Sequence, residues 1–205
     1  GYLAMETMPV QAKSDIDSYL IPATDSAAGG TALSTGMRVW INSVAVFPFL
    51  PYAPEDISVP INLCELAKAN DMAAGVVTTD ETSGATPASF SSHTIARGNE
   101  EDISNDQLLS GIDLIWGGAS ESVNAENTAE NGWTYVSSET ELMALEEGSR
   151  SFAQFSFDDL KYTTNKYDTP TIEEMTTKAI EILSSHGEKA SVIGRIVEGE
   201  GVTIK

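Results

Sequence analysis

The chain contains few of the residues that several common functions require. Among its 205 residues, 11 lysines and arginines stand against 31 aspartates and glutamates, a formal charge of −20. Such an acidic surface repels nucleic acid and anionic membranes, so neither is expected as a partner. A single cysteine, Cys64, excludes a disulfide within the chain. No apolar run approaches the roughly 18 residues that a membrane span needs.

Histidine is almost as scarce, with only His93 and His186. The chain begins at Gly1 without a methionine or a signal-like segment, which indicates a processed protein or a piece of a longer one. Its length fits one large domain or two small ones. The acidic surface is interpreted first as a device for solubility and second as a cation-binding surface.

Short β-rich runs alternate with helical patterns, which predicts an α/β fold with a largely parallel sheet. The segment 119–131 is polar and is expected to be a surface excursion, and 161–170 is expected to be a loop. The periodicity and the stop signals predict strands within 73–79, 112–118 and 132–138, and helices within 59–72, 100–111, 139–148 and 171–185.

The segment 21–36, IPATDSAAGGTALSTG, consists almost entirely of small residues. Asp25 is suited to cap a helix whose first turn contains Ser26, because its carboxylate accepts backbone N–H bonds. Gly29 and Gly30 would each cost that helix about 1 kcal/mol relative to alanine, so close packing or chemistry must demand them. A serine at a helix N-terminus faces free N–H groups that favour an oxyanion or a phosphate. A tightly packed helix with an ordinary cap explains the same residues without chemistry.

Two stretches resemble motifs of the alkaline phosphatase family. TDSAAGGTALSTG at 24–36 follows the segment that carries the family's nucleophilic serine, and METMPV at 5–10 resembles the segment just upstream. VVTTDETSGATPASFSSHTIAR at 76–97 resembles a strand and loop of the family that end in ATPA and, eleven residues after its threonine, in a phosphate-binding arginine. Thr86 and Arg97 have that spacing. The resemblance covers roughly residues 5 to 185, since GIDLIWGGA, GWTYVSS and PTIEEMTTKAIEILS resemble further family segments in the same order.

This resemblance implies a phosphomonoesterase that works through a covalent phosphoserine. Ser26 would attack phosphorus, activated by zinc that coordinates its oxygen. Arg97 would clamp two phosphate oxygens with its planar guanidinium, and Asp25 would orient Arg97 through a charge-assisted pair. Thr86 would ligate magnesium, which prefers oxygen ligands. The implied cofactors are therefore Zn²⁺ and Mg²⁺, and the implied substrates are small phosphate monoesters.

The chain departs from the family pattern at the metal ligands. Gly84 stands two residues before Thr86, where the family usually carries Asp or His, and glycine offers no ligand. The family's zinc ligands include an aspartate of its first strand and several histidines of its C-terminal half. Here His93 lies where the family's histidine is not a ligand, and His186 is expected to be a solvated residue after the last helix. The chain therefore resembles an incomplete member of the family.

The tail, residues 187–205, has two interpretations besides a plain edge strand. IVEG at 196–199 resembles a family strand that ends in a magnesium-binding glutamate, which would make Glu198 a ligand, although Thr203 stands where the family has a zinc-binding aspartate. The whole tail also resembles the C-terminus of aminoimidazole ribonucleotide synthetases, which indicates a fusion or an unrelated end. The apolar stretch 40–52 is interpreted as a buried loop, a subunit contact or a lid.

Together these observations predict one α/β domain over residues 1–205, with three layers, a mainly parallel sheet and helices on both faces. Ser26 is expected at a helix N-terminus near the carboxyl edge of the sheet. The predicted function is that of an alkaline-phosphatase-type enzyme, and the DSA context of the serine favours it over a related phosphodiesterase or sulfatase. The other alternative is a catalytically incomplete fragment or a non-catalytic phosphate-binding domain. The resemblance also implies a periplasmic or secreted protein and leaves a homodimer open.

Overall fold

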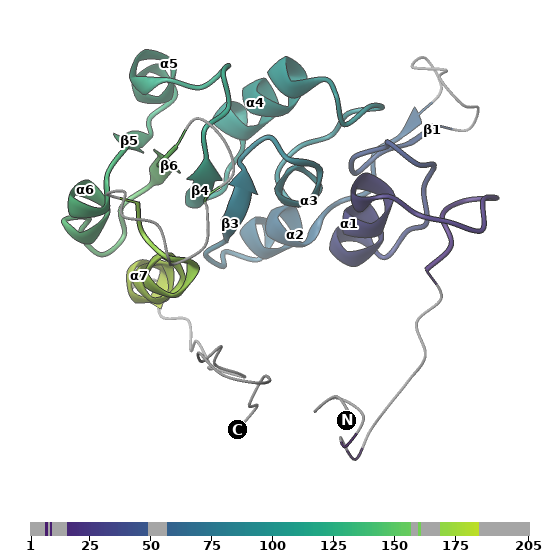
Figure 1. The fold of residues 1–205 in the computed structure, drawn as a ribbon, viewed down its shortest axis with the longest axis horizontal. Coiled ribbons are helices and arrows are strands. Elements are labelled where there is room, and N and C mark those ends of the chain that lie inside the picture. Colours follow the sequence, from purple (N-terminus) through teal and green to yellow (C-terminus); the bar gives the residue numbers. More distant parts are fainter. Residues whose placement is uncertain are drawn as a thin grey trace.

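A four-stranded sheet forms the centre of the protein (Figure 1). The structure is a computed structural model that describes residues 7, 9, 16–48, 57–156, 160 and 169–184. Every neighbouring pair in the sheet is parallel, as predicted, and the strand order is β3-β4-β6-β5. The strands are β3 (Gly75–Glu81), β4 (Leu114–Gly118), β5 (Thr134–Val136) and β6 (Ser151–Gln154), and a separate antiparallel pair is formed by β1 (Phe47–Pro48) and β2 (Ile57–Ser58).

Helices cover both faces of the sheet. In Figure 1, α7 (Ile172–Ser184) lies on one side of the strands and α4 (Glu100–Leu109) on the other, while α1 (Ser26–Thr35) lies beyond the β3 edge. Five of the helices fall inside ranges for which the sequence predicts a helix: α1, α2 (Leu63–Ala69), α4, α6 (Glu139–Met143) and α7. The other helices of the described residues are α3 (Ala85–Ala88) and α5 (Ala125–Glu130).

The central strand β4 shows why three layers form. Its side chains alternate between the two faces, and all five of its residues are buried. Leu114 and Trp116 belong to one core cluster, which also contains buried residues of α6 and α7. Ile115 belongs to a second cluster, which contains Cys64 of α2 and Leu108 of α4. The sheet is therefore the middle layer between two helical layers, which confirms the predicted fold class.

Two of the elements that the sequence analysis does not predict, β6 and α5, show what formed them. The strand β6 has only four residues and begins and ends with polar side chains, yet it is buried between β4 and β5. Ser151 at its start accepts a hydrogen bond from the indole N–H of Trp116 at 2.9 Å. The helix α5 lies inside the segment predicted as a surface excursion, and a reciprocal capping box between Asn124 and Asn127 begins it. Tertiary pairing and capping thus overcome weak local preferences.

The aromatic stretch after α1 is a loop packed against its own chain over its described residues. Val44, Ala45 and Val46 are buried. Tyr19 packs edge-to-face against Trp40 and Phe47, with ring centroids 5.2 Å and 4.8 Å apart. Of the three interpretations of 40–52, the buried loop therefore holds for residues 43–46, whereas Ile41 is exposed. Residues 49–52, most of the predicted loop 161–170, and the tail 187–205 lie outside the described residues.

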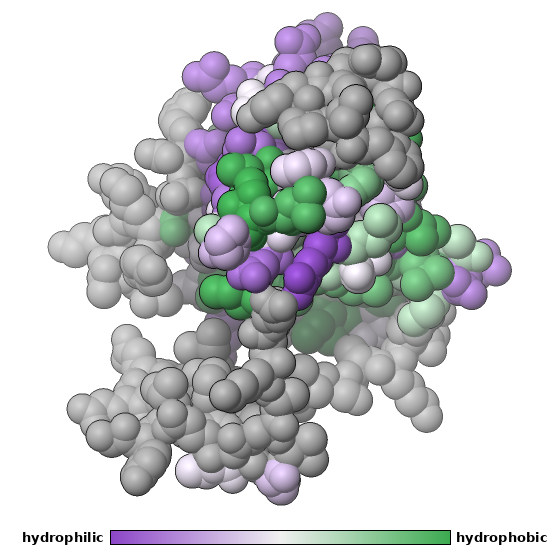
Figure 2. Space-filling model, turned by 90° about the vertical axis from the view of Figure 1, so that its right-hand side faces the viewer, coloured by the Kyte–Doolittle hydropathy of each residue, from purple (hydrophilic) through white to green (hydrophobic). Residues whose placement is uncertain are grey.

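Apolar surface remains exposed on the α1 side of the molecule. Figure 2 views that side and shows hydrophobic residues gathered beside hydrophilic ones. In and just after α1, the side chains of Leu33, Met37 and Ile41 are exposed. Over the part of the chain that the structure describes, none of the helices has the length and apolar character of a membrane span.

Candidate active site

The N-terminus of α1 presents Ser26 to solvent. Asp25 is the N-cap, in an extended conformation, and its Oδ1 accepts a hydrogen bond from the N–H of Ala28 at 2.9 Å. Ser26 is the first residue of the helix and is exposed. The remaining free N–H groups of the first turn and the helix dipole favour negative charge at this point. The predicted cap and helix are thus present, with the serine hydroxyl at the positive end.

Close packing of α1 on α3 explains why this helix consists of small residues. A Cβ atom on Gly30 would lie only 2.8 Å from Oγ of Ser89 and 3.5 Å from Cα of Thr86, so position 30 has no room for a side chain. Ser89 also donates a hydrogen bond to the carbonyl of Ala27 at 3.3 Å, which links the two helices. A Cβ on Gly29 would meet nothing closer than 3.8 Å. Packing therefore demands the glycine at position 30 but not the one at 29.

A loop after α1 connects the helix to the segment that carries Arg97. Thr31 of α1 donates its hydroxyl to the carbonyl of Ser43 at 3.2 Å and accepts from the N–H of Ala45 at 2.8 Å. Val44 forms an isolated antiparallel bridge with Thr94, with both N–H to carbonyl distances at 2.9 Å. The bridge holds the chain before Arg97 beside the N-terminal helix.

Arg97 reaches the nucleophile candidate directly. Its Nη1 donates a hydrogen bond to Oγ of Ser26 at 3.0 Å and lies 3.8 Å from Oδ2 of Asp25. The Arg97–Asp25 contact is thus an ion pair longer than a hydrogen bond. Two residues that are 71 positions apart in the sequence therefore form one site at the end of α1.

Asn42 contributes to this site through its backbone, which the sequence analysis does not predict. Its N–H donates to Oδ2 of Asp25 at 3.1 Å, and its carbonyl accepts from the N–H of Arg97 at 2.8 Å. Asn42 has a φ of 71°, in the left-handed region that asparagine tolerates better than most residues. An asparagine in an otherwise apolar loop was the signal available in the sequence. The backbone of Asn42 fixes the second carboxylate oxygen of Asp25 and the position of Arg97.

The arrangement suits a tetrahedral anion. The side chain of Arg97 is 40% exposed and that of Asp25 is 25% exposed, so the site is open to a ligand from solvent. A guanidinium offers two parallel N–H groups to phosphate oxygens, and a helix N-terminus offers backbone N–H groups and a positive dipole. Solvent weakens the Arg97–Asp25 pair at this exposure, so the pair orients the guanidinium more than it stabilises the fold.

The end of β3 and the start of α3 carry oxygen atoms of the kind that magnesium prefers. Thr86 lies in α3, where its Cα is 3.5 Å from the place of a Cβ on Gly30, and its side chain is exposed. Gly84 precedes α3 and offers no donor atom, as the sequence predicts. The carboxylate of Asp80, however, lies in the space that a side chain at position 84 would occupy. A hydroxyl and a carboxylate are oxygen ligands of the kind that Mg²⁺ prefers. Glu198, the other predicted magnesium ligand, lies outside the described residues.

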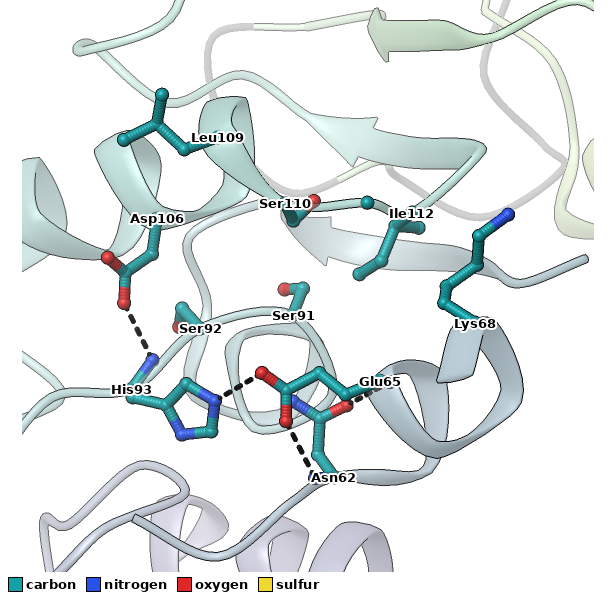
Figure 3. A pocket seen from close by; sticks show the side chains of 11 residues that line it. Asn62, Glu65, Lys68, Ser91, Ser92, His93, Asp106, Leu109, Ser110 and Ile112 are labelled. Carbon is teal, nitrogen blue, oxygen red and sulfur yellow. Dashed lines mark hydrogen bonds and ion pairs between the residues drawn. The ribbon is translucent and has the colours of Figure 1, made fainter. Parts of the chain in front are cut away.

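The described residues do not fit a zinc ion. Within those ranges, no three His, Cys, Asp or Glu side chains lie close enough together to hold a metal ion. His93 is occupied at both ring nitrogens, since Nδ1 lies 2.7 Å from the carbonyl oxygen of Ala45 and Nε2 lies 2.8 Å from Oε1 of Glu65. Figure 3 shows this His93–Glu65 pair in a cavity of about 370 Å³ that neither Ser26 nor Arg97 lines. His186 lies outside the described residues.

Comparisons with known proteins decide the family. Residues 2–131 match the alkaline phosphatase family. The chain belongs to this family. It is 30% identical over 174 residues to alkaline phosphatase 3 of Bacillus subtilis, a match that covers 78% of this chain and 36% of that protein. The chain thus spans little more than a third of the length of the curated bacterial alkaline phosphatases that it matches.

Solved alkaline phosphatases share the fold. The cold-active enzyme of a psychrophilic Shewanella species is 28% identical, with a TM-score of 0.69 over 80% of this chain and 40% of that one. A variant of the alkaline phosphatase from the Antarctic bacterium TAB5, solved with magnesium bound, is 26% identical, with a TM-score of 0.63 over 83% of this chain and 49% of that one. The resemblance of the sequence to the alkaline phosphatase family is therefore confirmed.

Proposed function

We propose that this alkaline phosphatase chain hydrolyses small phosphate monoesters through a phosphoserine on Ser26. The observation that carries the proposal is the 3.0 Å hydrogen bond from Arg97 to Ser26 at the N-terminus of α1. It brings a hydroxyl and a guanidinium to one exposed point, where the helix also favours an anion. Family membership supports the same chemistry, while the activity of this chain remains part of the proposal.

In the proposed reaction, the hydroxyl oxygen of Ser26 forms a bond to phosphorus as the ester P–O bond breaks. The alcohol leaves with a proton, and water then cleaves the serine phosphate to release inorganic phosphate. Arg97 binds phosphate oxygens through its N–H groups and offsets the charge that they carry in the transition state. Asp25 accepts hydrogen bonds from Ala28 and Asn42, so its carboxylate is fixed beside the guanidinium.

Metal dependence is a separate part of the proposal. Thr86 would hold magnesium together with an acidic oxygen, and Glu198 remains its proposed partner from the tail. When bound, metal ions supply positive charge that lowers the pKa of an attacking hydroxyl and stabilises phosphate oxygens. Zinc, which the family resemblance implies, has no ligand set among the described residues, so no step is derived through it.

The remaining proposals concern the protein's surroundings. A periplasmic or secreted location is proposed from the family alone. A homodimer is proposed for the same reason, and the exposed side chains of Leu33, Met37 and Ile41 on the α1 side offer apolar surface for such a contact (Figure 2). Light scattering, which measures the mass of the particle in solution, would test the dimer directly.

The test of the function is hydrolysis of p-nitrophenyl phosphate at alkaline pH with added Mg²⁺ and Zn²⁺. We expect activity in the native chain, a loss of about a thousandfold or more in Ser26→Ala, and no loss in the matched control Ser122→Ala. Bis-p-nitrophenyl phosphate distinguishes a phosphodiesterase from a phosphomonoesterase. Absence of hydrolysis, with phosphate still bound at Arg97, would instead establish the alternative of a phosphate-binding domain without turnover.

A further inference from the structure

The pairing of β3 with β4 is irregular near the C-terminal end of β3, and this irregularity sets the direction of the Asp80 side chain. Pairing with β4 proceeds regularly to Val77 and resumes only at Glu81, opposite Gly118. Between them, the N–H of Asp80 donates to Oγ1 of Thr78 at 3.0 Å, and Oδ1 of Asp80 accepts from the N–H of Glu81 at 3.0 Å. Such irregularities re-aim side chains at strand ends and are common beside active sites. Local hydrogen bonds thus fix the carboxylate at the carboxyl edge of the sheet.

Two glycines provide the room for this segment. A Cβ on Gly84 would lie 2.7 Å from Oδ1 of Asp80 and closer still to Oδ2. A Cβ on Gly117, in β4, would lie 2.7 Å from the carbonyl oxygen of Asp80 and 2.7 Å from Cγ2 of Thr78. Gly84 has φ −54° and ψ 149°, angles that any residue adopts. Space for the carboxylate, and not backbone conformation, therefore demands glycine at position 84.

We propose that Asp80 supplies the carboxylate of the magnesium site from position 80, with Thr86 as its neighbouring ligand. This inference rests on the proposed function, because it assigns a new residue to the metal site of that function. The family usually carries Asp or His two residues before the threonine, and Gly84 offers neither a ligand nor a side chain that could support one. The carboxylate of Asp80 takes up the space in which that side chain would begin. An oxygen ligand is therefore retained at this place, but it comes from Asp80 of β3 and not from position 84, the N-cap of α3.

A purely structural role for Asp80 makes a different prediction. Gly84 is the N-cap of α3 and has no side chain to satisfy the first N–H groups of the helix. A carboxylate nearby would stabilise these groups with or without a metal. Removing the carboxylate would then lower the melting temperature by the same amount in the presence and absence of Mg²⁺. A ligand role instead makes the Mg²⁺-dependent part of the melting temperature depend on Asp80.

The test is a calorimetric Mg²⁺ titration at about 0.1 M salt, which screens diffuse binding to the acidic surface, together with melting curves with and without Mg²⁺. We expect Asp80→Asn to weaken Mg²⁺ binding about tenfold or more and to abolish the Mg²⁺-dependent rise in melting temperature. Gly84→Ala, which pushes a methyl group into the carboxylate, should weaken binding similarly. The swap Asp80→Ala with Gly84→Asp should restore it, because the acid then comes from position 84. Asp102→Asn, an exposed acid of α4, is the matched control and should leave the Mg²⁺ affinity and the Mg²⁺-dependent rise in melting temperature unchanged.

Three results would overturn the inference: native Mg²⁺ affinity in Asp80→Asn, failure of the native chain to bind Mg²⁺, or a loss of melting temperature that is equal with and without Mg²⁺. If Asp80→Asn does not fold, the swap variant and Gly84→Ala decide the question. The proposed function fails separately. If Mg²⁺ binds through Asp80 but Ser26 is never phosphorylated, the inference holds and the proposed function is refuted. If Ser26 is phosphorylated but Mg²⁺ binding does not depend on Asp80, the proposed function holds and the inference is refuted.

Discussion

Nη1 of Arg97 donates a hydrogen bond to Oγ of Ser26 at 3.0 Å, although the two residues are 71 positions apart in the chain. Their contact depends on the loop between α1 and the Arg97 segment, in which Val44 pairs with Thr94 and Asn42 bonds both Asp25 and Arg97. The small residues of α1 serve the same end, because they let the helix pack closely on α3. Much of the local structure around α1 thus serves to position Ser26 beside Arg97.

Replacement of Arg97 tests the phosphate clamp. We expect Arg97→Ala to lower kcat/KM for a phosphate monoester about a hundredfold, and Arg97→Lys to lower it about tenfold, because an ammonium keeps the charge but not the planar pair of donors. Inhibition by inorganic phosphate should weaken in the same order. Arg38→Lys, at an exposed arginine, is the control. Equal phosphate inhibition in Arg97→Ala and the native chain would show that the phosphate binds elsewhere.

The two adjacent glycines of α1 should respond in opposite directions to alanine. Gly30→Ala places a methyl group 2.8 Å from Oγ of Ser89, so overpacking should lower the free energy of unfolding by about 1–3 kcal/mol. Gly29→Ala meets no atom closer than 3.8 Å and should raise it by up to about 1 kcal/mol through helix propensity. Urea unfolding of both variants measures the difference. Similar midpoints for the two would mean that α1 does not pack on α3 as described.

Cys64 should make the fold sensitive to alkaline pH. Burial, followed by the charges of Glu65 and Asp113, raises the pKa of its thiol from 9.0 to about 11. The folded state therefore holds a proton that the unfolded chain releases first, so stability is complete below pH 9 and falls as the pH rises towards 11. The expected loss over that interval is about 2 kcal/mol.

Unfolding of the native chain and of Cys64→Ala across this pH range isolates the effect of the thiol. The variant loses some packing at every pH, but its additional loss between pH 9 and pH 11 should disappear. A parallel decline in both proteins would assign the alkaline sensitivity to other groups. Since the proposed activity is assayed at alkaline pH, the comparison also shows how far the fold persists under assay conditions.

Local signals in the sequence were sufficient for the helix that begins at Ser26 and for the parallel sheet. Asp25 is a strong capping residue, and its carboxylate caps α1 as expected. The spacing of Thr86 and Arg97 follows the family motif, and the place of Thr86 in the same site as Arg97 stays a prediction. The buried strand over 112–118 was recognisable from its continuous apolar run, and β4 lies within it.

Other features depend on neighbours that are distant in the sequence. Ser151–Gln154 is a strand because β4 and β5 lie on either side of it, and its own residues carry little strand preference. Asn42 joins the site through backbone groups, which no side-chain motif records. The place of Asp80 over Gly84 follows from an irregularity in the pairing of β3 with β4, which only the assembled sheet reveals.

The most direct test of the central claim is to trap phosphate on Ser26. The chain is incubated with Mg²⁺, Zn²⁺ and labelled inorganic phosphate over a range of pH, and is then denatured and digested for mass spectrometry. We predict one phosphoryl group on the peptide that contains Ser26, less of it in Arg97→Ala, and none in Ser26→Ala. Label on any other residue, or none on Ser26 while a phosphate monoester is being hydrolysed, would contradict the account.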